Sequence, residues 1–136
     1  MKSDIYKAGG ILIKDRKLLV ERSQGKDIFL TPGGRIEEGE TAREALVREL
    51  FEEFRIKVLD SDLEEFGTFT SRSATSGDKI LTMYVFFVKS WEGEPTPDNE
   101  IEEILWIDSS FLGKIKIGSI FEHEVIPRLK DKNLID

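Results

Sequence analysis

The sequence contains no cysteine and a single histidine, His123, among its 136 residues. Without thiols, disulfide bonds and cysteine-based zinc sites are excluded. Long apolar runs are also absent: the longest, at 83–88, is far shorter than the roughly 20 residues that a membrane-spanning helix needs. The first residues lack the apolar stretch of a secretory signal, so we expect a cytoplasmic protein that does not enter a membrane.

Positive charge is in deficit, since 20 lysines and arginines face 27 acidic residues and the net charge is -7 at pH 7. Such a chain is unsuited to non-specific binding of nucleic acid, so we expect no nucleic-acid partner. A polyanionic substrate would be repelled unless divalent cations bridge it to the acidic groups. The chain length and the 39% share of apolar residues predict one folded domain over residues 1–136.

Apolar and β-branched runs predict the strands. They lie at residues 6–14, 17–22, 56–59, 63–72, 79–91 and 102–108, with a short extended segment at 28–31. Loops are expected at 23–27, 73–78 and 92–99. Gly9 and Gly10 indicate a bulge or a close approach to the backbone, and Pro32-Gly33-Gly34 is expected to break regular structure.

Two amphipathic helices are predicted. The first begins at Thr41, because Thr41 and Glu44 match a capping box. Its expected apolar face consists of Leu46, Val47, Leu50, Phe51 and Phe54. The second spans 118–130 and should kink or restart at Pro127. Ser109 or Ser110 is expected to cap one further turn. The pattern predicts helices layered on a mixed sheet.

Three glutamates, Glu49, Glu52 and Glu53, share an arc on the other side of the first helix. Like charges four positions apart cost a few tenths of a kcal/mol even in water, so the cluster indicates a bound cation. Carboxylates at this spacing converge on one or two ions, and Mg²⁺ prefers such hard oxygen ligands. Taken alone, however, this run is also typical of a solvated acidic face.

The residues around this cluster resemble the Nudix box. Gly34, Glu40 and residues 48–56 match the family pattern G-x5-E-x7-R-E-U-x-E-E-x-G-U, in which U is a bulky aliphatic residue, at every specified position but one. Residues 29–34 (FLTPGG) also resemble the segment that leads into the box. The exception is Arg55, which stands where the family has a left-handed glycine, a conformation that costs other residues about 1 kcal/mol or more. The resemblance implies the Nudix fold, an α/β/α sandwich with a mixed β-sheet in the α+β class.

The resemblance also implies an activity, the hydrolysis of nucleoside diphosphates linked to another moiety with Mg²⁺ or Mn²⁺. It implies that Glu52 and Glu53 are metal ligands and that Glu49 is a ligand or a water-orienting base. A backbone carbonyl of the Gly33-Gly34 turn, which also faces the substrate, would add an oxygen. Arg48 would orient the carboxylates, and Glu40 would brace the loop or reach the metal through water.

Weaker candidates lie outside the box. Glu100, in the acidic run with Glu102 and Glu103, is either a further metal-binding or basic glutamate or part of a solvated loop. Arg22 either contacts phosphate or is a surface arginine. Phe29 either stacks on a base or packs in the core. We interpret His123 as an exposed residue. We interpret Trp91 and Trp106 as packing residues.

The substrate is the least determined property. No proline or tyrosine occurs between Arg55 and Met83, where ADP-ribose and dinucleoside polyphosphate hydrolases of the family tend to carry one. This favours a nucleoside triphosphate, modified or not, cleaved to the monophosphate and pyrophosphate. Nucleotide sugars, ADP-ribose and dinucleoside polyphosphates stay open, as does a non-catalytic nucleotide-binding module, which retention of all three glutamates disfavours. Monomer and homodimer are equally open.

Overall fold

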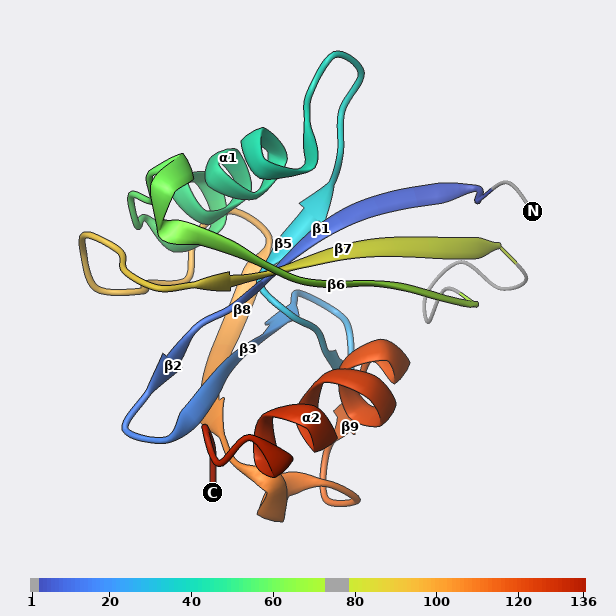
Figure 1. Ribbon diagram of the computed structural model, residues 1–136, viewed down its shortest axis with the longest axis vertical. Helices are drawn as coiled ribbons and strands as arrows, with labels where there is room; N and C mark the ends of the chain where they lie inside the picture. The colour runs from blue at the N-terminus through green and yellow to red at the C-terminus, as the bar shows by residue number, and fades with distance from the viewer. Residues whose placement is uncertain (1–2, 73–78) are drawn as a thin grey trace.

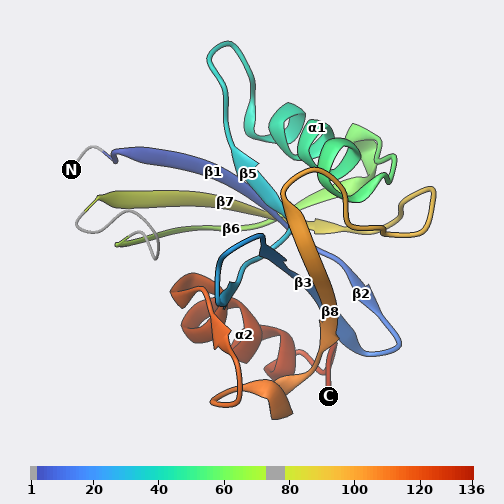
Figure 2. The same ribbon diagram turned by 180° about the vertical axis from the view of Figure 1, so that it is seen from behind.

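Two helical segments lie on opposite sides of the β-structure in the computed structural model, which describes residues 3–72 and 79–136 (Figures 1 and 2). Helix α1 (Ala42–Phe54) covers one side, and the segment ending in α2 (Ile126–Asp131) covers the other. Within the described ranges, no helix is long and apolar enough to span a membrane.

The largest sheet has the strand order β5-β1-β7-β6. Its strands are β5 (Gly33–Arg35), β1 (Ile5–Ile11), β7 (Ile80–Val88) and β6 (Leu63–Arg72). Strands β1 and β7 run parallel while β1–β5 and β6–β7 are antiparallel, so the sheet is mixed as predicted.

Two smaller sheets complete the β-structure. The first has the order β2-β3-β8 and consists of β2 (Ile13–Lys14), β3 (Lys17–Ser23) and β8 (Ile101–Ile107). The second pairs β4 (Ile28–Phe29) with β9 (Lys116–Ile117) in parallel. Short 3-10 turns occur at Asp60–Asp62 and Ser109–Phe111.

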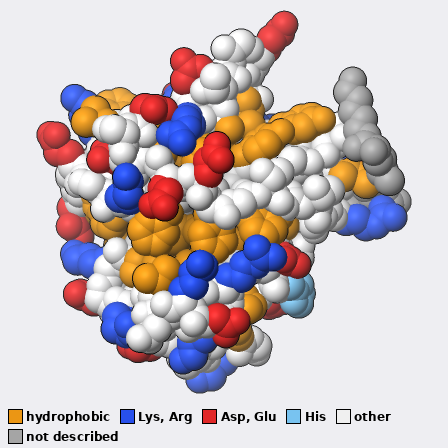
Figure 3. Space-filling model, viewed as in Figure 1, with side chains coloured by type: hydrophobic (Ala, Val, Ile, Leu, Met, Phe, Trp, Pro, Cys, Tyr) orange, Lys and Arg blue, Asp and Glu red, His pale blue; other side chains and the backbone are white. Residues whose placement is uncertain are grey.

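Apolar side chains form two buried clusters, one on each side of the strands. The cluster beneath α1 includes Leu46, Leu50 and Phe54, and the other includes Phe121 and Leu129 from the C-terminal segment. Figure 3 shows further apolar side chains across the middle of one face, between the parts of the molecule that carry α1 and α2.

Helix α1 begins as predicted, with both hydrogen bonds of the Thr41–Glu44 capping box present. Its buried side differs from the prediction, because Phe51 is 65% exposed while Ala45 is fully buried. The buried arc is therefore rotated away from Phe51 and toward Glu49 and Glu53. This rotation draws the two carboxylates out of bulk solvent.

The strand predictions needed three corrections. The first run is interrupted at Leu12, between β1 and β2. Residues 56–59 form only the isolated bridge of Lys57 with Glu92. Gly33 and Gly34 do not break regular structure but begin β5, because glycine lets it approach β1 closely: a Cβ at Gly33 would lie 2.1 Å from the Ala8 carbonyl oxygen.

The helical predictions also needed correction. The turn at Ser109–Phe111 is capped by Asp108, whose carboxylate accepts a hydrogen bond from the Ser110 N–H, rather than by a serine. The C-terminal segment includes a π-helical turn at Phe121–Val125 before α2 starts. Pro127 lies in the first turn of α2, where its missing N–H is tolerated, so the predicted restart occurs there. The loop predicted at 73–78 lies outside the described residues.

Candidate active site

A cavity of about 400 Å³ lies against the polar side of α1. The rest of its wall comes from residues of β1, β3, β5, β6, β7 and β8, from residues 118–121, and from Leu30, Thr31, Glu37 and Glu100 between these elements. Acidic side chains of α1 thus share one space with apolar side chains such as Leu81, Met83 and Phe121. Such a mixed lining suits a ligand that has both a charged and an apolar part.

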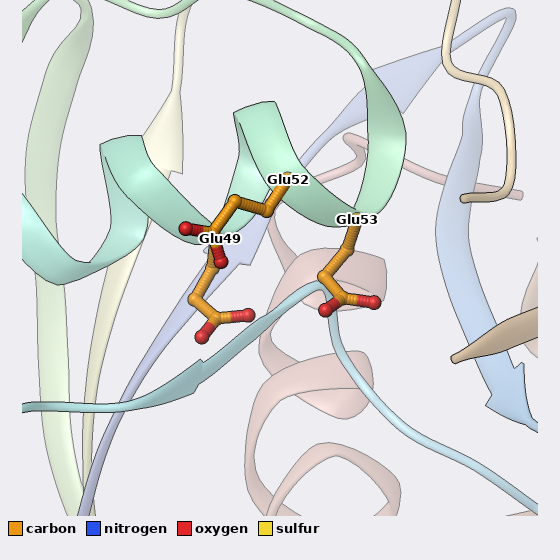
Figure 4. A group of neighbouring side chains, drawn as sticks. All are labelled: Glu49, Glu52 and Glu53. Carbon is orange, nitrogen blue, oxygen red and sulfur yellow. The ribbon is translucent and has the colours of Figure 1, made fainter. Parts of the chain in front are cut away.

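The three predicted glutamates of α1 converge on this cavity. One carboxylate oxygen from each of Glu49, Glu52 and Glu53 lies within 4.8 Å of the others, and Figure 4 shows the three side chains extending from the same stretch of helix. Oε2 of Glu53 is buried and has no hydrogen-bond partner among the described residues. Three carboxylates that each offer a hard oxygen, one of them with an unsatisfied oxygen, fit a divalent cation such as Mg²⁺.

The pKa shifts of the glutamates also indicate a cation site. Burial raises the pKa of Glu49, although Arg48 opposes this shift. Burial also raises the pKa of Glu53, and the charges of Glu49 and Glu100 raise it further. The site therefore holds more negative charge than its surroundings compensate, and a cation would relieve that repulsion.

Arg48 holds the surrounding carboxylates in position through hydrogen bonds. Its Nε and Nη2 donate to the two oxygens of Glu40 at 2.7 and 3.0 Å, and its Nη1 donates to Glu49 at 2.8 Å and Glu52 at 3.3 Å. Glu40 also accepts a hydrogen bond from the Glu37 N–H at 2.9 Å. Glu40 lies outside the cavity lining, so it braces the loop before α1 and holds the fork of Arg48.

The two glycines that begin β5 pack directly against the acidic cluster. A Cβ at Gly34 would lie 2.6 Å from the Glu49 carboxyl carbon, so only glycine leaves Glu49 where it is. Gly33 adopts a φ of 139°, a conformation that favours glycine. The structure thereby brings Gly33 and Gly34, which were predicted to form a turn but begin β5, beside the cluster.

Two of the predicted substrate-binding residues lie elsewhere. Arg22 is outside the cavity lining and donates to Glu102 at 2.8 Å and to Glu103 at 3.1 Å. Since side chains alternate along β3, its neighbours Glu21 and Ser23 face the cavity instead. Phe29 is a core residue, only 7% exposed.

The remaining candidates fit one of the alternatives considered for each. Glu100 lines the cavity with the α1 glutamates. His123 is exposed. Trp91 and Trp106 stack on each other with ring centroids 6.5 Å apart, as packing residues do.

Sequence reasoning missed several residues of the cavity, notably Lys7, Glu21, Arg35 and Ser119. Glu21 follows three fully buried apolar residues of β3, and a carboxylate in that position was the available signal. Burial raises its pKa to about 7, and the charge of Glu53 adds to the shift. Burial and the nearby Arg35 lower the pKa of Lys7.

Comparison with known proteins agrees with this geometry. Residues 6–129 match the model of the NUDIX domain. An 8-oxo-dGTP diphosphatase of Haemophilus influenzae is 33% identical over 116 residues, which cover 82% of this chain and 81% of the relative. An ADP-ribose pyrophosphatase of Methanocaldococcus jannaschii is 32% identical over 120 residues, covering 86% of this chain and 67% of that protein.

Solved structures share the fold. The solution structure of the E. coli ORF135 protein superposes with a TM-score of 0.74 at 22% identity, covering 97% of this chain and 94% of that one. The chain belongs to the Nudix family, and the predicted α+β Nudix fold is confirmed. It is a hydrolase of phosphoanhydride bonds.

Proposed function

We propose that the protein is a Mg²⁺-dependent nucleoside triphosphate pyrophosphohydrolase that releases a nucleoside monophosphate and pyrophosphate. The observation that carries this proposal is the convergence of oxygens from Glu49, Glu52 and Glu53 within 4.8 Å on the wall of a cavity large enough for a nucleotide. A triphosphate chain is polyanionic, so it enters so acidic a cavity only when divalent cations accompany it.

The chain's own residues would divide the work. Glu49, Glu52 and Glu53 would hold the ion, with the Gly33 carbonyl and Glu100 as further oxygen ligands. When bound, the ion would offset charge on the phosphate oxygens and favour deprotonation of the attacking water. Glu49 would serve as a ligand or orient that water, because Arg48 and Gly34 fix its carboxylate.

The reaction is a hydrolysis at phosphorus. The water oxygen forms a new bond to one phosphorus atom, the bridging P–O bond of the anhydride breaks, and the water proton passes to a carboxylate of the site or to solvent. Arg48 keeps the glutamates in position throughout, while the apolar wall at Leu81, Met83 and Phe121 would exclude water from the nucleoside end.

The relatives support two substrate classes. Similarity to an 8-oxo-dGTP diphosphatase favours a modified nucleoside triphosphate, and that match spans most of both proteins. Similarity to an ADP-ribose pyrophosphatase supports ADP-ribose as the second candidate. In both cases the same acidic cluster would act on an anhydride, so the cavity wall and not the cluster would select the substrate.

A substrate panel with Mg²⁺ tests the proposal. It would contain 8-oxo-dGTP, the unmodified nucleoside triphosphates, ADP-ribose, a nucleotide sugar and a dinucleoside polyphosphate, with products identified by phosphorus NMR. The highest kcat/KM should fall on a triphosphate, with pyrophosphate as a product; release of inorganic phosphate, or a preference for ADP-ribose, would contradict it.

Variants identify the metal site in the same assay. Glu53→Gln should abolish turnover. Glu102→Gln is the matched control, because Glu102 is an exposed glutamate paired with Arg22 outside the cavity. If Glu53→Gln were as active as the parent, the assignment of the metal site would be wrong.

A further inference from the structure

Lys7 and Arg35 place two like charges side by side on the cavity wall. They lie opposite each other where β1 pairs with β5, and both line the cavity. Residues in such a cross-strand pair have Cβ atoms about 5 Å apart, and like charges there destabilise the sheet. Within residues 3–72 and 79–136, neither Lys7 Nζ nor the Arg35 guanidinium has a hydrogen-bond or ion-pair partner. The fold therefore leaves both cations unsatisfied.

A second pair of this kind, Lys14 and Lys17, serves as a comparison. These lysines lie opposite each other where β2 pairs with β3. Both are exposed, so water and salt screen their repulsion, and Lys14 also has the Glu94 carboxylate at 4.0 Å. Neither lysine lines the cavity. An exposed pair thus needs no ligand, and partial burial is what sets Lys7 apart.

Lys7 is half-buried, and its surroundings do not offset its charge. Burial and the charge of Arg35 lower the pKa of Lys7, although Glu21 and Glu49 act in the opposite sense. Two nearby carboxylates thus fail to compensate for the lost hydration and for the second cation. An anionic ligand that reaches both Lys7 and Arg35 would satisfy them, and phosphate oxygens accept hydrogen bonds from both kinds of side chain.

The place of Lys7 on the sheet indicates which part of a ligand it meets. Strand β1 lies between β5 and β7 (Figure 1). Lys7 therefore pairs with Arg35 on one side and with Met83 of the apolar wall on the other, and all three line the cavity. Arg35 follows Gly34, which packs against the Glu49 carboxylate. A nucleotide that lays its nucleoside on the apolar wall and its phosphates toward the acidic cluster crosses Lys7 where the two parts join.

We propose that the Lys7 ammonium binds the phosphate attached to the nucleoside, and that Arg35, one strand nearer the acidic cluster, binds the pyrophosphate part of the chain. The inference rests on the proposed function, because it takes a nucleoside with a chain of phosphates as the ligand of this cavity. It adds Lys7, which lies outside the Nudix box, to the substrate-binding residues. The repulsion between the two cations is offset when phosphates lie against both.

Binding of the separate products tests which phosphate each cation holds. Isothermal titration calorimetry of the full chain with Mg²⁺ would use 8-oxo-dGMP, AMP and inorganic pyrophosphate. Lys7→Met, which removes the charge and keeps most of the length, should weaken the monophosphate that the parent binds best by about tenfold or more. Its affinity for pyrophosphate should change by less than about threefold. Arg35→Met should show the reverse pattern, and because Arg35 is exposed this variant should fold normally.

Controls separate a binding role of Lys7 from a structural one. Lys17→Met, from the exposed pair, should bind all three ligands like the parent. Without ligand, Lys7→Met should melt at or above the temperature of the parent, because repulsion has been removed, whereas loss of a structural lysine would lower it. The inference would be overturned if Lys7→Met weakened monophosphate and pyrophosphate equally, if it weakened neither, or if the parent bound neither monophosphate. A parent that binds the products as expected but cleaves no nucleotide in the substrate panel would overturn the proposed function alone.

Discussion

The Arg55 guanidinium donates a hydrogen bond to the Asp98 carboxylate at 2.8 Å, joining the end of α1 to the loop that leads to Glu100. Arg55 itself takes the left-handed conformation, with φ 57° and ψ 30°, and its N–H closes the helix. The family pattern has glycine at this position, and arginine adopts the same backbone with a side-chain contact in addition. The departure from the motif therefore leaves the helix end intact.

Replacing Arg55 with glycine should leave activity nearly unchanged. The change relieves left-handed strain of about 1 kcal/mol. It also removes an exposed ion pair, which contributes little to stability. We expect the free energy of unfolding to change by less than about 1 kcal/mol and kcat/KM by less than about fivefold. Steady-state kinetics and urea denaturation of Arg55→Gly measure both. A much larger loss of kcat/KM would mean that Arg55 contacts the substrate.

The same loop caps the end of α1 through its backbone and through Asn99. Asp98 N–H donates to the Glu53 carbonyl at 3.0 Å, and Asn99 Nδ2 donates to the Glu52 carbonyl at 2.6 Å. The last carbonyls of a helix have no partner within it, so the loop satisfies them. Glu100, next in the chain, is thereby held at the cavity.

Asn99→Gly should weaken metal binding through Glu100. Glycine keeps the positive φ of 53° at this position and removes only the amide. We expect the Mg²⁺ concentration for half-maximal activity to rise by about three- to tenfold, since one hydrogen bond contributes about 1 kcal/mol. Asn133→Gly is the control, because Asn133 also has a positive φ, 60°, and is not part of the cavity lining. If Asn99→Gly had the same effect after Glu100→Gln, its action would not run through Glu100.

How far the sequence predicts this site depends on the range of the interactions involved. The acidic cluster and the cap at Thr41 follow from spacings of three and four residues, which a helix converts directly into neighbours. Spacing alone could not decide which of Glu21 and Arg22 faces the cavity. The face that each side chain occupies depends on the pairing of β3 with β8, about 80 residues further along the chain. Phe51 was misplaced for a related reason: periodicity gives the width of an apolar face, but tertiary packing decides which edge of it is buried.

Gly34→Ala should impair catalysis without straining the backbone. The added Cβ would lie 2.6 Å from the Glu49 carboxyl carbon, so Glu49 must move. Displacing a positioned catalytic group by about 1 Å can cost about 100-fold in rate. Gly39→Ala, in the loop between β5 and α1, is the opposite case, since its φ is 85° and nothing lies within 4 Å of the added carbon. Gly39→Ala should lower the stability of the protein and leave kcat unchanged. If kcat fell equally in both variants, general loosening of this region, and not displacement of Glu49, would explain the loss of activity.

Arg48→Lys should show that the guanidinium fork, and not the charge alone, positions the glutamates. Lysine keeps the positive charge but cannot donate to both oxygens of Glu40 and to Glu49 together. We expect kcat to fall by about tenfold or more. Glu40→Gln disturbs the same fork, so the double variant should lose less than the product of the two single losses. Independent, multiplying losses in steady-state assays would contradict this positioning role.

The stability of the metal-free protein should depend on pH through Glu21. Burial raises the pKa of this carboxyl from its ordinary 4.5 to about 7, with Glu53 and Glu49 adding to the shift and Lys7 and Ser23 opposing it. Between these two values the folded state holds a proton that the unfolded state has released, so the free energy of unfolding falls as pH rises through this window. The fall amounts to at most about 1.4 kcal/mol per pH unit.

Glu21→Gln removes this titrating group. Denaturant titrations in EDTA should therefore give the variant a flatter profile of unfolding free energy against pH, and a larger free energy of unfolding than the parent above pH 7. Glu102→Gln should follow the parent, whereas parallel profiles for Glu21→Gln and the parent would show that the buried carboxyl does not titrate in this range.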